Sequence, residues 1–172
     1  HNMAAVKSLC TRGIVLEHGK IKINSSVEQA VSYYLSGDSE ITNQKKFGVE
    51  FDKTIFKLEE ISIHNAEKSI HDPLSESEVI QLNTFIKIKS HESSRYQITY
   101  HLHNEMGEPL FSFSNSNEDL SLKQGHNVLS CDFPAHFFQS GQYFLSLFVV
   151  EDQRQAIFVE KDILSFTIVD GA

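Results

Sequence analysis

The stretch RYQITYHLHN, residues 95–104, alternates apolar and polar side chains with a period of two. Successive side chains of a β-strand point to opposite faces, so the pattern predicts a strand with one buried and one outward face. Seven more stretches of this kind lie between residues 57 and 169, separated by turn signals such as HDP, KQGHN and QSGQ. Eight short strands with no helical pattern between them predict a mainly β fold, an antiparallel β-sandwich of the immunoglobulin-like or jelly-roll type.

The first part of the chain differs in composition from this region. The whole chain has 13 phenylalanines, and none of them precedes Phe47. Residues 3–12 have helical spacing and end at Gly13, residues 14–23 alternate as a β-hairpin, and residues 26–35 follow a serine N-cap. We therefore expect a small α/β unit of helix, hairpin and helix.

A polar stretch, SGDSEITNQKK, follows the second helix and reads as a linker. These composition shifts divide the chain into residues 1–35, a linker over 36–50 and the sandwich over 51–172.

Composition narrows the classes of partner. The formal net charge of −8 and the absence of clustered Lys and Arg argue against nucleic acid as the main partner. No apolar run approaches the roughly 18 to 20 residues that a membrane span needs. Cys10 and Cys131 form no CxxC pair, which indicates neither a disulfide framework nor a zinc site, and no signal-peptide pattern opens the chain. We expect a cytoplasmic protein.

The first 21 residues, HNMAAVKSLCTRGIVLEHGKI, carry a resemblance to a known family. Their wording looks like the end of an ABC-transporter nucleotide-binding domain, and it is similar to the ATP-binding subunits of polysaccharide exporters of the O-antigen type, the Wzt-like proteins. Two later stretches, LHNEMGEPLFSFSN and FFQSGQYFLSLFVVED, look like turns of the family's C-terminal sandwich.

The resemblance implies a carbohydrate-binding sandwich that recognises a cytoplasmic polysaccharide, by its non-reducing end, for export. It implies that residues 1–35 are the C-terminal remnant of the nucleotide-binding domain and that His1 is the switch histidine of the intact ATPase. It also implies a homodimer, a transmembrane permease partner and a place on the inner face of the inner membrane.

ATP hydrolysis needs more than this chain offers. The P-loop GxxxxGK[ST] and an acidic Walker-B residue are both missing, so ATP and Mg²⁺ are expected only in a full-length parent. We expect no cofactor, no metal site and no enzyme activity in this chain.

One polar row of the 95–104 strand is a candidate glycan surface. Gln97, Thr99, His101 and His103 share one side of the strand and could hydrogen-bond sugar hydroxyls. An ordinary solvated face is the alternative. A metal site at His101 and His103 lacks a third ligand placed by spacing.

The stretch GQYFLSLFVVED, residues 141–152, is apolar on both sides. One set, Phe144, Ser146 and Phe148, would stack on a sugar ring and hydrogen-bond it. The alternatives are cover by the protein's own sandwich and 134–139 loop, or burial against a second copy in a purely structural dimerisation domain.

Two acidic pairs, Glu59-Glu60 and Glu151-Asp152, raise the further alternative of a glycosidase. Adjacent residues of a strand point to opposite faces, which argues against either pair. Cys131 is interpreted as a buried structural thiol.

Overall fold

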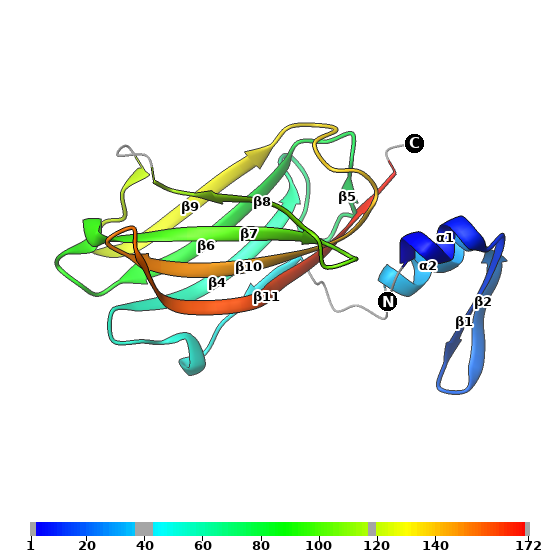
Figure 1. The fold of residues 1–172 in the computed structure, drawn as a ribbon, viewed down its shortest axis with the longest axis horizontal. Helices are drawn as coiled ribbons and strands as arrows, with labels where there is room; N and C mark the ends of the chain where they lie inside the picture. Colours follow the sequence, from blue (N-terminus) through cyan, green and yellow to red (C-terminus); the bar gives the residue numbers. More distant parts are fainter. Residues whose placement is uncertain (1–2, 37–42, 117–119, 171–172) are drawn as a thin grey trace.

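The structure is a computed structural model that describes residues 3–36, 43–116 and 120–170. Figure 1 shows a body of long strands and a smaller body of two helices and a hairpin. His1, the expected switch histidine, lies outside the described residues.

The large body consists of two facing sheets. The five-stranded sheet has the order β5-β11-β10-β7-β8, and the four-stranded sheet has the order β3-β4-β6-β9 (Figure 1). The bounds are β3 Gln44–Lys46, β4 Phe56–Asn65, β5 Leu74–Ser75, β6 Ile80–Ile88, β7 Tyr96–Asn104, β8 Pro109–Ser114, β9 Gly125–Phe133, β10 Gly141–Glu151 and β11 Gln155–Val169, with 3₁₀ turns at Val49–Phe51 and Ser93–Arg95. The predicted mainly β sandwich is confirmed.

The core lies between the sheets because each strand sends alternate residues inward. On β7 these are Tyr96, Ile98, Tyr100 and Leu102, and the facing strands contribute Leu58, Ile61, Ile63, Leu82 and Ile86. A hydrogen bond of 2.5 Å between the Tyr100 and Thr84 hydroxyls joins the two sheets inside this core. Burial raises the pKa of Tyr100 far above its ordinary value.

Three features of the strands differ from the sequence prediction. The stretches QAIFVEKD and LSFTIVD form one strand, β11. Its register with β10 shifts between Glu160, which pairs with Leu147, and Leu164, which pairs with Leu145. The short strand β5 pairs with β11 in parallel, the one such pair among the described strands. Strand β3 pairs with β4 although it lies in the range expected as a linker.

The small body contains α1 (Met3–Leu9), β1 (Arg12–Glu17), β2 (Lys20–Ser26) and α2 (Val27–Ser36). The first helix is shorter than predicted, and Gly13 is part of β1 and not a helix cap. A Cβ at Gly13 would stand 2.4 Å from the Ala30 Cβ, so glycine lets the hairpin pack against α2. The N-cap prediction is confirmed, because the Gln29 N–H donates to the Ser26 hydroxyl at 3.4 Å.

Candidate functional site

The register of β7 and β10 brings the sequence-predicted site residues together. Phe144 lies opposite His103, Ser146 opposite His101, and Phe148 opposite Thr99. Gln97 continues the same row one pair further along, opposite Val150. Because the alternate residues of both strands are buried between the sheets, the seven residues share the outward face of the five-stranded sheet. We call this the β7/β10 face.

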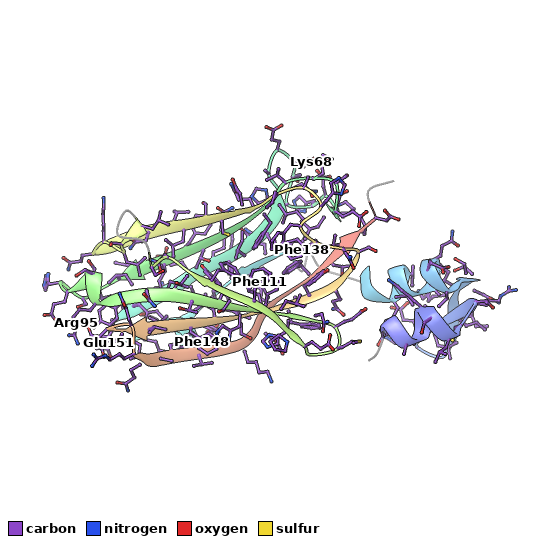
Figure 2. The ribbon with its side chains drawn as sticks, turned by 45° about the horizontal axis from the view of Figure 1, so that its top comes forward. Lys68, Arg95, Phe111, Phe138, Phe148 and Glu151 are labelled. Atoms are coloured by element: carbon purple, nitrogen blue, oxygen red, sulfur yellow. The ribbon has the colours of Figure 1, made fainter. Side chains whose placement is uncertain are left out.

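The 134–139 loop does not cover this face. Its buried ring, Phe138, packs inward against Phe133, Tyr143 and Phe166, with ring centroids 5.0 to 5.6 Å apart. Figure 2 labels Phe138 amid the side chains between the sheets and Phe148 beside β10, away from the four-stranded sheet. Phe138 therefore anchors the loop to the core, and the other residues of the loop are exposed.

Two aromatic rings meet on the β7/β10 face. The ring centroids of His101 and Phe148 are 4.3 Å apart, with an angle of 42° between the ring planes. Val159 of β11 lies opposite Phe148 and is 51% exposed. Together they form a small apolar surface beside the polar side chains of β7, which suits the C–H face of a sugar ring.

A pocket of about 240 Å³ opens at one end of the face. Its walls come from β7, the β7–β8 turn, β10 and β11, through His103, Asn104, Glu105, Gly107, Phe144, Lys161 and Asp162. Two buried polar atoms in these walls, His103 Nδ1 and Glu105 Oε2, have no hydrogen-bond partner in the described chain. Buried polar atoms are nearly always paired, so this pair of atoms calls for a ligand or ordered water.

Local structure fixes both sides of the pocket. In the β7–β8 turn, the Asn104 side-chain oxygen accepts the N–H groups of Met106 and Glu108 at 3.0 Å, and Gly107 has a φ of 77°. On the other side, Asp162 adopts a φ of 52° where β11 breaks register, and its N–H donates to the Ser146 hydroxyl at 3.1 Å. A backbone held in this way keeps the pocket walls in place.

Ser146 differs from the expectation of an outward hydrogen-bonding centre. Its side chain is 3% exposed and its oxygen already accepts the Asp162 N–H. The register break of β11 thus covers Ser146 and places Lys161 and Asp162 beside Phe144.

The sequence analysis did not predict five residues of the pocket: Asn104, Glu105, Gly107, Lys161 and Asp162. Glu105 continues the spacing of Gln97, Thr99, His101 and His103, and that signal could have identified it. Lys161 and Asp162 reach the pocket only through the pairing of β11 with β10, and no local sequence pattern predicts this placement.

The outward face of the four-stranded sheet holds a second polar cluster. The Asn83 side chain donates to Gln81 and His64 at 3.2 Å and accepts the Ser130 hydroxyl at 2.6 Å. Gln81 in turn donates to Asp132 at 2.8 Å. The His64 ring contacts the Asn65 carbonyl through Nδ1 at 2.9 Å, which fits a neutral ring with its proton on Nδ1.

The residues of both acidic pairs bond other side chains of the protein. A register shift between Leu58 and Glu60 lets both glutamates of the first pair bond outward groups: Glu59 bonds His126 at 3.2 Å, and Glu60 accepts from Gln44 at 2.6 Å. The prediction that Glu59 and Glu60 point to opposite faces is therefore wrong.

The second acidic pair holds Arg95. Asp152 and Glu151 lie 2.8 and 3.3 Å from its guanidinium. The hydrogen bond from Arg95 lowers the pKa of Asp152. Cys131 is half-buried, and burial raises the pKa of its thiol, as expected of a structural cysteine.

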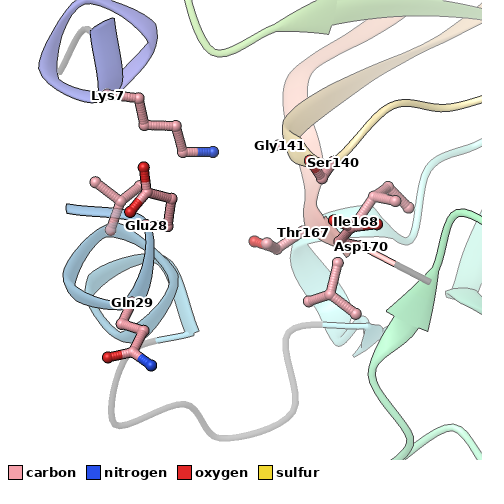
Figure 3. Close-up of a pocket in the computed structure, with 10 residues that line it drawn as sticks. Lys7, Glu28, Gln29, Ser140, Gly141, Thr167, Ile168 and Asp170 are labelled. Atoms are coloured by element: carbon pink, nitrogen blue, oxygen red, sulfur yellow. The ribbon is translucent and has the colours of Figure 1, made fainter. Parts of the chain in front are cut away.

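A further groove of about 410 Å³ lies where the small body meets the end of the sandwich. Figure 3 shows Lys7 and Glu28 on the helical side and Thr167, Ile168 and Asp170 at the end of β11. The groove is lined by one basic side chain, Lys7, and two acidic side chains, Glu28 and Asp170, which gives it a formal net charge of −1.

The described residues lack the features of two other kinds of site. They contain no group of three or more His, Cys, Asp or Glu side chains placed to hold a metal ion. No described helix is long and apolar enough to cross a bilayer.

Similarity to known proteins identifies the fold of the sandwich. No family model matches the chain, and none of the curated proteins is detectably similar to it. Among solved structures, the chain is similar to the crystal structure of the C-terminal domain of wzt, with a TM-score of 0.57 and 13% identity over 75% of this chain and 78% of that chain. The sandwich therefore has the fold of that domain.

Proposed function

We propose that the sandwich binds a polysaccharide on the β7/β10 face, with one sugar ring of the chain in the His103–Phe144 pocket. The observation that carries the proposal is the pair of unpartnered buried atoms, His103 Nδ1 and Glu105 Oε2, next to an aromatic ring. A sugar supplies adjacent hydroxyls that can bond both atoms and a C–H face that can contact Phe144.

The size of the pocket supports the binding of a single sugar ring. Its volume of about 240 Å³ is below the roughly 300 to 1,000 Å³ typical of pockets for drug-sized ligands. One ring fits this scale, and the rest of the chain would lie along Phe148, His101, Thr99 and Gln97. An end of the polysaccharide, such as its non-reducing end, suits a pocket that lies at one end of the β7/β10 face.

The biological setting follows from the resemblance of residues 1–21 and from the fold shared with the C-terminal domain of wzt. In this proposal the chain is part of an ABC exporter subunit for an O-antigen-type polysaccharide, and residues 1–35 belong to its ATPase domain. The full-length parent would bind ATP and Mg²⁺, pair with a second copy and a permease, and work at the inner face of the inner membrane. The sandwich selects the cargo and performs no chemistry on it.

Isothermal titration of the 172-residue chain with a panel of bacterial surface polysaccharides tests the function. We expect saturable binding of one glycan class and little response to the others. If no surface glycan of the source organism bound, the proposal would fail, and release of shorter sugars during the titration would indicate a hydrolase instead.

One observation favours a second function, a structural dimerisation domain. Val159 is 51% exposed beside Phe148, and the two side chains would be buried by a second copy placed on this face. Light scattering of the parent chain and of the Phe148→Ser variant separates the two functions. A parent that is dimeric, a variant that is monomeric, and no glycan binding by either protein would support the dimerisation domain.

A further inference from the structure

The charged side chains of the His103–Phe144 pocket do not balance. Its walls hold two carboxylates, Glu105 and Asp162, and one ammonium group, that of Lys161, which gives a formal net charge of −1. The His103 ring adds no charge while it is neutral. The whole chain carries a formal net charge of −8, which adds to the attraction for a cation. The pocket is therefore a better site for a cationic ligand than for an anionic one.

None of these three charges is paired within the protein. Across residues 3–36, 43–116 and 120–170, no ion pair and no side-chain hydrogen bond involves Glu105, Asp162 or Lys161. Water can solvate Lys161 and Asp162, which are both exposed, whereas the Glu105 Oε2 atom is buried. An unpaired charge that is shielded from water costs free energy, and a bound cation would offset that cost.

Two further groups of the wall suit the same kind of ligand. Phe144 is half-buried in the wall, and the face of an aromatic ring attracts a cation that lies within about 6 Å of the ring centre. The unpartnered His103 Nδ1 accepts a hydrogen bond when the ring proton is on the other nitrogen. An ammonium group has three N–H donors, so it can bond the imidazole and both carboxylates at once.

We infer that the sugar held in this pocket is an amino sugar with a free, protonated amine. The inference rests on the function proposed above and names the class of sugar that the pocket selects. A hydroxyl at the same position would form neutral hydrogen bonds, which are roughly half as strong as the charge-assisted bonds of an ammonium group. A sugar that presents a carboxylate or a phosphate there would meet the like charges of Glu105 and Asp162.

Three monosaccharides that differ at one ring position test the inference: glucose, glucosamine and N-acetylglucosamine. Each is titrated into the 172-residue chain near neutral pH and followed through the backbone amide NMR shifts of His103, Glu105 and Phe144. We expect glucosamine to bind about tenfold more tightly than glucose, because its hydrogen bonds are charge-assisted. N-Acetylglucosamine retains the nitrogen without the charge and should bind no more tightly than glucose.

Two variants with opposite expected effects check that the charge of the pocket decides the preference. Glu105→Gln keeps the size of the side chain and removes its charge, so the preference for glucosamine over glucose should largely disappear. Lys161→Gln removes the cation from the wall and should strengthen glucosamine binding about two- to fivefold. The matched control is Glu92→Gln, which makes the same charge change as Glu105→Gln just before the other end of β7 and should leave the preference unchanged.

The outcomes separate this inference from the proposed function. Equal affinity for glucose and glucosamine overturns the inference and leaves polysaccharide binding on the β7/β10 face intact. A preference for glucosamine that persists in the Glu105→Gln variant also overturns it, as does a lack of response to glucosamine in a chain that binds a polysaccharide. The absence of binding by every monosaccharide and every polysaccharide would instead defeat the proposed function and the inference with it.

Discussion

The outward faces of the two sheets are both polar, but their side chains bond differently. On the four-stranded sheet, Asn83 joins His64, Gln81 and Ser130 in one hydrogen-bonded cluster. On the β7/β10 face, no side-chain hydrogen bond links Gln97, Thr99, His101 or His103 to another described residue, and the adjacent pocket holds two unpartnered buried atoms.

The difference separates a surface that stabilises the protein from one that can bind a ligand. A side chain bonded within the protein must break that bond before it can bind a sugar, whereas an unpartnered one gains a bond. Polar composition alone therefore does not identify a binding face.

The largest expected effect concerns Glu105. The Glu105→Gln variant loses a charged acceptor for a sugar hydroxyl, which is worth about 1.5 to 3 kcal/mol, or roughly a ten- to hundredfold rise in Kd. Isothermal titration with the cognate glycan measures it. Asp132→Asn makes the same charge change on the other face and should leave Kd unchanged; equal losses in both variants would remove the distinction between the faces.

The next effect concerns the stability of the fold and the outward face of the four-stranded sheet. Asn83→Ala leaves His64 and Ser130 without their partner in a site where Asn83 is 8% exposed. We expect a loss of about 1 to 3 kcal/mol in the free energy of unfolding, measured by urea denaturation. Thr99→Ala on the β7/β10 face should change it by less than about 0.5 kcal/mol. A larger loss in the Thr99 variant would show that both faces are structural.

The smallest effect concerns the aromatic pair on the β7/β10 face. Phe148→Ser removes the ring that contacts His101, and we expect a three- to tenfold rise in Kd, about 1 kcal/mol. Phe85→Ser is the matched change on the four-stranded sheet and should not affect glycan affinity. Unchanged affinity in the Phe148 variant would confine the site to the pocket.

Alternation along the chain predicted the outward residues of β7 and β10, because side-chain direction in a strand depends only on parity. It could not predict that Ser146 is covered, since the cover comes from Asp162, which is 16 residues away in sequence and reaches it through a register break. The Asn83 cluster has the same cause: its partners at positions 64 and 130 meet only through the pairing of β4, β6 and β9.

Local patterns failed in a second way at Glu59 and Glu60. Parity assumes a regular strand, and the register shift there brings both carboxylates to outward partners. The helix end was also misplaced: a glycine after a helical pattern suggests a cap, whereas Gly13 is required by its contact with Ala30.

In the proposed function, the β7/β10 face binds the glycan and the outward face of the four-stranded sheet does not. Titration of the isotope-labelled chain with an oligosaccharide of the cognate glycan, followed through backbone amide shifts, tests it most directly. We expect saturable shifts at His103, Glu105, Phe144 and Phe148. Shifts that instead centre on Gln81, Asn83 and Ser130 would contradict it.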